Sequence, residues 1–320
     1  MKYLFICAIH NLALEHENIL INCKNGYISN KKDKLRPIFE NELSYYTLGA
    51  HSIDEITDSD SYYMEEGVLE SIKQSEVDKF GTQYCFLILR QIQINMNRLW
   101  LIQDNAVYIR DGFLYAYEDD LSTGHTFKGS LSAINTFADG NRKSIVFNDE
   151  LKNEFISNEV CFIQERDALI KNEETQDFRN VSQYQHLKSS KLTRKELAHM
   201  YIAKARAEGV VAMKVLLYCS ALEALISTTT TELSHRVSER IATILGSNKE
   251  DRCAIYNSVK AGYDVRSKVA HGDFLKKNQE QIEQISIDID EYLRKLIVLE
   301  DPYCLNNKEI DKFFLEKLMS

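Results

Sequence analysis

The chain has 320 residues, 44% of them hydrophobic and 27% charged, which is the composition of a globular protein and excludes a disordered or fibrous one. Taken over the whole chain, the formal net charge of −9 argues against a nucleic-acid partner. The charge is uneven, however: residues 40–78 hold eleven acidic side chains and one basic, whereas residues 178–206 hold seven basic and one acidic. We interpret both segments as solvated faces, with an approach for RNA as the alternative for the basic one.

The seven cysteines are odd in number and scattered, with no C-x-x-C pair. This pattern favours reduced thiols in a cytoplasm over disulfides or a zinc site. An apolar run at residues 3–9 is too short to span a membrane, and we interpret it as a buried strand. No G-x-G-x-x-G, H-E-x-x-H or G-x-S-x-G motif occurs, and Asp288 and Asp290 are expected at the surface. We therefore expect a cytoplasmic protein with no metal, no cofactor and no membrane partner.

The first 145 residues predict a mixed α and β domain. Asn25-Gly26 is a favoured type I′ turn pair and predicts a hairpin over residues 19–28. Asp111-Gly112 predicts a second hairpin over residues 107–117. The other expected elements are a strand at 2–9, helices at 65–79 and 82–101, a loop at 119–140 and a strand at 143–147. Ile88, Ile92 and Ile94 leave a strand as the alternative within 82–101.

Helical periodicity predominates in residues 146–320 and predicts an all-α domain. Thr229 and Glu232 have the spacing of a capping box ahead of a helix that Gly246 ends. The expected helices are 151–171, 193–207, 210–226, 233–245, 251–270, 279–299 and 308–319. The expected fold class is thus an α+β N-terminal domain, residues 1–145, followed by an all-α helical bundle, residues 146–320.

Arg266 and His271 lie five positions apart at the predicted end of a helix. Histidine is the usual proton-transfer group near neutral pH, and arginine is a fixed cation that matches phosphate, so together they are able to cleave RNA without a metal. The alternative is an ordinary helix stop, in which cations favour the negative end of the helix and Gly272 supplies the left-handed residue after it.

The spacing of this pair raises a geometric difficulty. At 3.6 residues per turn, side chains five positions apart point about 140° away from each other. One straight helix therefore does not direct both at one phosphate. Either the helix loosens at His271 or two copies of the motif meet, so the catalytic interpretation with a regular helix predicts a symmetric dimer.

Three blocks in this region, residues 213–226, 231–240 and 263–273, resemble the HEPN superfamily (higher eukaryotes and prokaryotes nucleotide-binding), and within it the Apea-like branch. The resemblance covers about residues 190–300. It implies a bundle of four to five helices that forms a homodimer, with two Arg–His motifs in a composite, metal-independent endoribonuclease site. By this analogy the RNA 2′-hydroxyl is the nucleophile and a 2′,3′-cyclic phosphate is the product, with His271 moving the proton and Arg266 holding the phosphate.

Several further residues are candidates for a supporting role. Glu223 stands in an apolar helix, where an unpaired carboxylate is costly, so we expect it to pair with Arg240 or Arg266. The resemblance places Ser267 where active members often have Asn, Asp or His. His235 and Tyr263 either line the groove of the proposed site or belong to the surface or the core. Asp273 either hydrogen-bonds His271 or solvates the loop.

The function expected from the sequence is a homodimeric HEPN endoribonuclease that acts on RNA in phage defence or a related stress response. Residues 1–145 more loosely resemble the α+β part that precedes the helical domain in Apea-like proteins, and we interpret them as a sensing or target-binding module that answers to a regulatory protein or a phage-derived trigger. As an alternative to a solvated face, the acidic segment 40–78 covers the basic segment 178–206 and inhibits the protein. The competing functions are a catalytically silent HEPN module that binds RNA, a nucleotide or a protein, and the toxin of a toxin–antitoxin pair.

Overall fold

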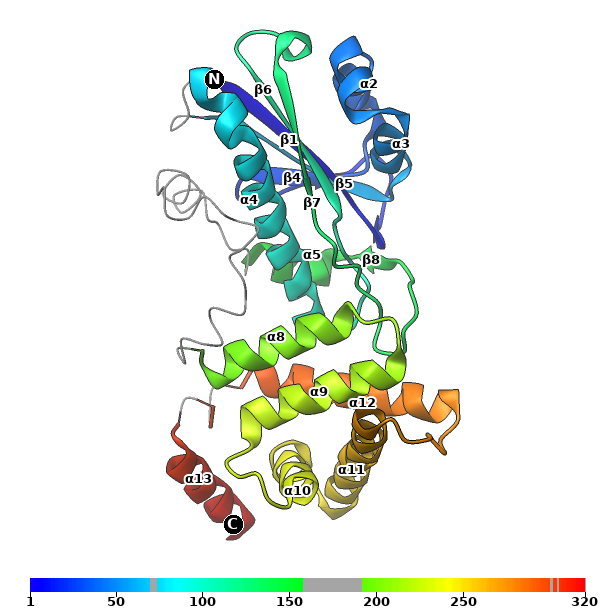
Figure 1. Cartoon of the computed structure of the whole chain (residues 1–320), viewed down its shortest axis with the longest axis vertical. Helices are drawn as coiled ribbons and strands as arrows, with labels where there is room; N and C mark the ends of the chain where they lie inside the picture. Colours follow the sequence, from blue (N-terminus) through cyan, green and yellow to red (C-terminus); the bar gives the residue numbers. More distant parts are fainter. Residues whose placement is uncertain (70–73, 158–191, 300–301, 304, 320) are drawn as a thin grey trace. The chain divides into compact units, whose positions relative to one another are not determined.

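The computed structural model describes residues 1–69, 74–157, 192–299, 302–303 and 305–319 (Figure 1). These residues fold into two compact units. The sheet unit comprises the described residues of Met1–Ile102, Ala106–Ile134 and Lys143–Ser182. The helical unit comprises those of Gln103–Asn105, Asn135–Arg142 and Gln183–Ser320. An α+β region is thus followed by a mostly helical one, as the sequence predicts.

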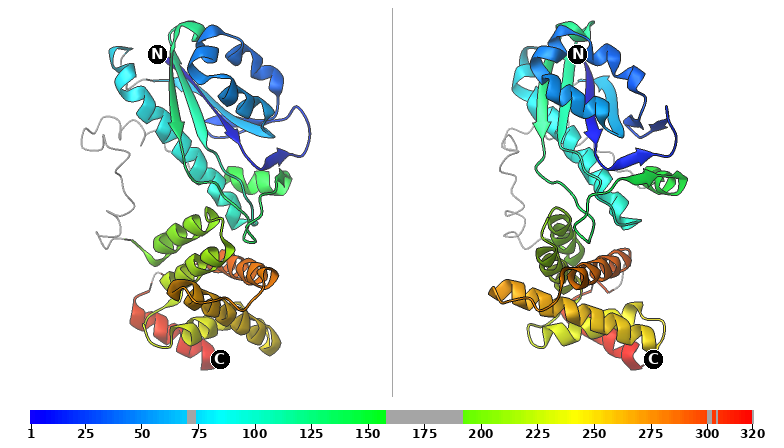
Figure 2. Two further views of the ribbon diagram at one scale, coloured as in Figure 1. Left: turned by 45° about the vertical axis from the view of Figure 1, so that its right-hand side comes forward. Right: turned by 90° about the vertical axis from the view of Figure 1, so that its right-hand side faces the viewer.

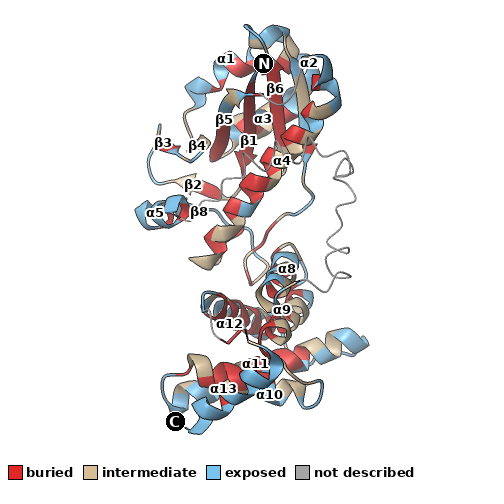
Figure 3. Cartoon of the chain, turned by 90° about the vertical axis from the view of Figure 1, so that its left-hand side faces the viewer, coloured by how far each residue is buried: buried red, intermediate tan, exposed pale blue. Residues whose placement is uncertain are grey.

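The sheet unit is built on a six-stranded antiparallel sheet in the order β3-β4-β5-β1-β6-β7. Its strands, in chain order, are β1 (Lys2–Ile9), β3 (Leu20–Asn22), β4 (Gly26–Ser29), β5 (Ser61–Val68), β6 (Asp111–Tyr117) and β7 (His125–Ser130). β2 (Leu12–Leu14) and β8 (Ile145–Phe147) form a separate parallel pair, and α5 (Asp149–Ser157) follows β8. The buried residues gather on the central strands β1, β5 and β6 (Figure 3).

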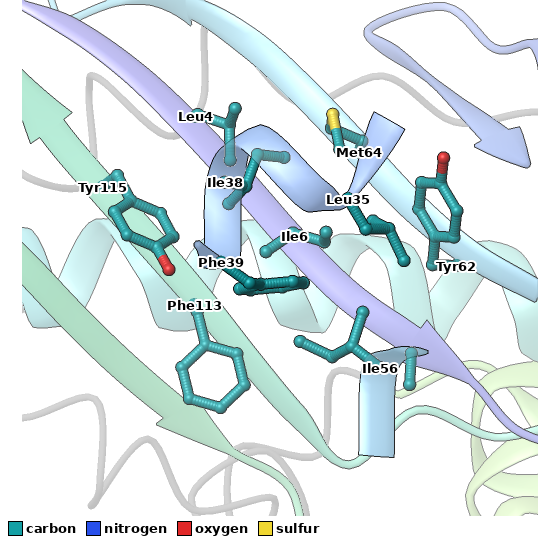
Figure 4. Close-up of a cluster of buried hydrophobic side chains, with 11 residues drawn as sticks. Leu4, Ile6, Leu35, Ile38, Phe39, Ile56, Tyr62, Met64, Phe113 and Tyr115 are labelled. Carbon is teal, nitrogen blue, oxygen red and sulfur yellow. The ribbon is translucent and has the colours of Figure 1, made fainter. Parts of the chain in front are cut away.

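Helices cover both faces of this sheet (Figure 2). Alternate residues of β1, such as Leu4 and Ile6, pack in a cluster with α1 (Arg36–Phe39) and α3 (Ala50–Asp58), and α2 (Glu42–Leu48) adds partly buried residues to it (Figure 4). The intervening residues face α4 (Val77–Arg98); the Tyr3 ring, for example, packs edge-on against Tyr84. β1 is apolar on both faces because it is buried on both. Short 3₁₀ turns complete the unit: η1 (Lys32–Lys34), η2 (Gln74–Glu76), η3 (Leu99–Leu101) and η4 (Leu121–Thr123).

The helical unit is organised around α9 (Val211–Ile226), which packs against α8, α11 and α12. The surrounding helices are α8 (Arg194–Arg206), α10 (Leu233–Leu245), α11 (Lys249–His271), α12 (Gln279–Ile297) and α13 (Asn307–Met319). α8 and α12 begin with capping boxes, Thr193 with Glu196 and Asn278 with Gln281, which satisfy the first free amides of each helix. Among the residues described, no helix combines the length and apolar character needed to cross a membrane.

Two segments from the N-terminal half of the sequence belong to the helical unit and meet a buried ionic cluster there. Arg206 is buried and donates hydrogen bonds to Asn105, while Lys214 is fully buried and donates to the carbonyl of Ala205 at 2.8 Å. Asp290 is also fully buried and pairs with Arg294 at 2.8 Å. The expectation that Asp290 lies at the surface is therefore wrong, because the positive charges of Arg206 and Lys214 from other helices, together with Arg294, surround its buried carboxylate.

The structure confirms the first hairpin, the strand at 2–9, the strand ending at Phe147 and the helix over 82–101. The type I′ turn predicted at Asn25-Gly26 is wrong, because Gly26 already belongs to β4 and neither residue has the positive φ that this turn requires. The predicted helix at 65–79 is wrong in its first part, because residues 61–68 pair along β1 as β5 and long-range pairing outweighs the helix propensity of Glu65 and Glu66. The loop expected at 119–140 contains β7, which pairs with β6. Only residues 151–157 of the helix expected at 151–171 are among those described, and they are helical. Much of the basic segment 178–206 also lies outside the described residues.

Two local predictions fail for identifiable reasons. The hairpin at Asp111-Gly112 is wrong: both residues belong to the continuous strand β6, with Gly112 opposite Cys7. A Cβ at Gly112 would lie 2.6 Å from the Phe5 ring, so this glycine serves a close approach and not a turn. The capping box at Thr229 and Glu232 is also wrong, because Glu232 itself directly precedes α10 in a left-handed conformation with φ of 49°.

Candidate functional site

The predicted catalytic pair lies on the last turns of α11, which extend beyond the helices packed around them (Figure 2 and Figure 3). α11 continues as helix to His271, and Gly272 then takes a left-handed φ of 70°. The amides of Gly272 and Asp273 donate back to the carbonyls of Val269 and Lys268, at 3.3 and 2.8 Å. The expected helix stop is thus present, and the helix does not loosen before His271.

Arg266 is held by the carboxylate of Glu223 on α9. Its Nη2 atom lies 3.3 Å from Oε1 and 3.4 Å from Oε2 of Glu223. Both distances exceed the roughly 2.7–2.9 Å of a strong charged hydrogen bond, so the contact orients the guanidinium without fully engaging it. The Arg266 side chain is 35% exposed, and that of Glu223 is 21% exposed. Of the two expected partners of Glu223, the structure therefore has Arg266.

Glu223 is partly buried beside Arg266 and Tyr263. Burial raises the pKa of the Glu223 carboxyl, and the positive charge of Arg266 and the Tyr263 hydroxyl lower it by less. Tyr263 lies one turn before Arg266 on α11 and is buried; burial, the neighbouring Cys219 and Glu223 raise its pKa, so its phenol stays neutral. Tyr263 thus belongs to the core and contacts the carboxylate that orients Arg266.

His271 and its nearest polar neighbours are exposed. Within the described parts of the chain, the His271 ring makes no hydrogen bond and no ion pair, and Ser267 is exposed on the same helix. Asp273 lies 3.6 Å from the ammonium of Lys268. Of the two roles considered for Asp273, solvation of the loop fits this arrangement, since its carboxylate is directed to a lysine and not to His271.

His235 and Arg240 are not part of this group. His235 is hydrogen-bonded through Nδ1 to the hydroxyl of Tyr256 at 2.9 Å. Tyr256 precedes Arg266 by ten residues, a rise of about 15 Å along α11. Arg240 is buried, donates to the carbonyl of Ile226 at 2.8 Å and forms an ion pair with Asp311 of α13. Arg240 therefore ties helices together, away from Glu223.

The arrangement presents a guanidinium and an imidazole on different sides of one regular helix. The angle of about 140° between them persists, because α11 is continuous from Arg266 to His271. One chain alone thus does not bring both groups to a single phosphate. No group of three or more His, Cys, Asp or Glu suited to a metal ion is present among the residues described.

Sequence reasoning identified Glu223 from its charge inside an apolar helix, but it did not identify the buried ionic cluster. Its members come from distant segments, namely Asp104, Arg206, Lys214, Asp290 and Arg294. Burial raises the pKa of Asp104 to about 6, with the charge of Asp290 adding to the shift, and lowers the pKa of Lys214 to about 8. The one sequence signal for such a cluster is Lys214, a charged residue inside the apolar helix α9.

Comparisons with protein-family models, with curated proteins and with solved structures found no match to this chain. The family resemblance of residues 213–273 therefore stays a prediction, and the function is inferred from the side chains at the end of α11.

Proposed function

We propose that the protein is a metal-independent endoribonuclease of the HEPN type that acts as a homodimer in the cytoplasm, in phage defence or a related stress response. One observation carries this proposal: Arg266, oriented by Glu223 yet 35% exposed, shares the projecting end of α11 with the exposed His271. An arginine held in place at a surface, with donors left for a phosphate, is suited to anion recognition.

The geometry of α11 supports a homodimer. A two-fold axis beside the end of this helix would bring Arg266 of one protomer toward His271 of its partner, which one straight helix does not allow. The projecting end of α11 offers the surface that such an axis requires (Figure 2). Each dimer would then hold two equivalent Arg–His pairs.

His271 and Arg266 each have one role in the proposed reaction. The imidazole of His271 removes the proton from a ribose 2′-hydroxyl, and the resulting oxygen attacks the adjacent phosphorus. The bond to the 5′-oxygen of the next nucleotide breaks, and that oxygen takes up a proton. The products are a 2′,3′-cyclic phosphate and a 5′-hydroxyl. Arg266 offsets the negative charge that grows on the phosphate oxygens.

A catalytically silent RNA-binding or partner-binding module is the second candidate, and the state of His271 favours it. No described residue orients the His271 ring, whereas a general base is normally held by a second group. In the nuclease, the partner protomer or the RNA would have to supply that orientation. We propose the sheet unit as the module that senses a trigger or selects the target in either case.

The test is cleavage of labelled single-stranded RNA in EDTA by the wild type, Arg266→Ala and His271→Ala. His235→Ala is a matched control, because His235 is an exposed histidine of the same unit that lies away from Arg266. We expect the wild type and the control to leave cyclic phosphates, and the two motif variants to lose about 100-fold or more of the rate. Equal cleavage by all four proteins would show that other residues, or a contaminant, act. No cleavage by a dimeric wild type would favour the silent module.

A further inference from the structure

Phe274 is the most exposed of the large hydrophobic side chains in the described residues, at 85%. It lies in the loop between α11 and α12, three residues after His271. Three residues of extended chain span at most about 11 Å, so Phe274 lies within that reach of His271. At this exposure the ring takes little part in the packing of the helical unit and is accessible to a ligand.

Phe274 lies between Asp273 and Leu275 in the sequence, and two cations, Lys276 and Lys277, follow directly. Asp273 is paired with Lys268 of the last turn of α11, so the cations of this loop outnumber its carboxylates. No other exposed large hydrophobic side chain occurs between Met213 and Ile287. The core of a subunit interface is usually enriched in aromatic residues and depleted in lysine, and two lysines directly after Phe274 do not fit that pattern. An aromatic side chain beside cations fits single-stranded nucleic acid, whose bases stack on the ring while the phosphates meet the lysines.

We propose that Phe274 stacks on an unpaired RNA base next to the reacting phosphate, and that Lys276 and Lys277 hold the adjoining phosphates. This proposal rests on the RNA substrate of the proposed function and narrows it to single-stranded or looped RNA. A base in a duplex is stacked between its neighbours and does not offer a face to an outside ring, so duplex RNA would not use Phe274.

The experiment measures binding without cleavage. The probe is a fluorescein-labelled single-stranded oligoribonucleotide with 2′-O-methyl groups, which lacks the attacking hydroxyl, and its duplex is the comparison. We expect the wild type to prefer the single strand, and Phe274→Ala to weaken single-strand binding about tenfold while leaving duplex binding unchanged. Phe274→Tyr should restore the affinity. Tyr46→Ala is the matched control, because Tyr46 is a 78% exposed aromatic residue of the sheet unit.

A fluorescent variant separates stacking from an indirect effect. The only native tryptophan, Trp100, is buried, so Phe274→Trp introduces a single exposed indole. Single-stranded probe should quench its emission, and duplex should not. Wild-type affinity in Phe274→Ala would overturn the proposal. So would a monomeric Phe274→Ala at concentrations where the wild type is dimeric, since Phe274 would then be a subunit contact.

The two proposals fail in different ways. Loss of single-strand binding in Phe274→Ala, in a protein that never cleaves unmodified RNA, would support the stacking site and contradict the nuclease. Cleavage that depends on His271 but not on Phe274 would contradict the stacking site alone.

Discussion

The strongest test of the composite site is complementation between two inactive variants. Arg266→Ala keeps His271, and His271→Ala keeps Arg266. Since the two side chains diverge by about 140° on a continuous α11, an active pair must combine residues of two protomers. A mixed dimer of the two variants would then contain one intact pair and one pair that lacks both groups.

The expected magnitude follows from counting these pairs. Random exchange of protomers at equal amounts makes about half of the dimers mixed, and each mixed dimer holds one of the two pairs of the wild type. The mixture should therefore recover about a quarter of the wild-type rate, whereas each variant alone should stay about 100-fold or more below it. Such a gain is far outside the error of a cleavage assay.

The assay is the rate of RNA cleavage in EDTA after the two variants have been unfolded together and refolded, or incubated until protomers exchange. Each variant carries a different affinity tag, so that co-purification measures the fraction of mixed dimers. A mixture that forms mixed dimers but stays as inactive as its components would refute the reasoning. The pair would then act within one chain, or each site would need all four groups.

Three other outcomes are expected. Glu223→Gln keeps the shape of the side chain but removes the charge that orients the guanidinium of Arg266. We expect it to lower kcat about fivefold, with a smaller change in KM and no change in thermal stability. A loss of stability without a loss of kcat would count against an orienting role. Gly112→Val should lower the free energy of unfolding by about 1–3 kcal/mol, measured by urea denaturation followed through Trp100 emission. Gly209→Ala is the control and should leave it almost unchanged, because a Cβ at residue 209 would have nothing within 4 Å. Similar losses in both variants would contradict the close approach at Gly112. Burial raises the pKa of Asp104 to about 6, so the folded state binds more protons than the unfolded state between about pH 4 and 6. The contribution of Asp104 should therefore lower the free energy of unfolding as pH rises through this window. Asp104→Asn should flatten that slope, and an unchanged slope would exclude Asp104 as its source.

Features that depend on neighbouring residues could be predicted from the amino-acid sequence. The hydrophobic period predicts the helices from residue 194 onward to within a few residues of their observed ends. Gly272 ends α11 where a residue with a left-handed φ is needed, and the short polar segment after β3 allows the chain to reverse into β4. These outcomes are local because the backbone angles and hydrogen bonds concerned lie within a few residues along the chain.

Features that depend on residues far apart in sequence could not be predicted without the folded chain. Residues 61–68 form a strand because β1 lies beside them, and Gly112 is in a strand because Phe5 packs over it. Glu223 meets Arg266, 43 positions away, and not Arg240. The choice between these two arginines follows from which face of α9 meets α11, and no spacing along one helix specifies it. The same holds for Asp290, whose burial depends on the three-dimensional cluster of charges around it.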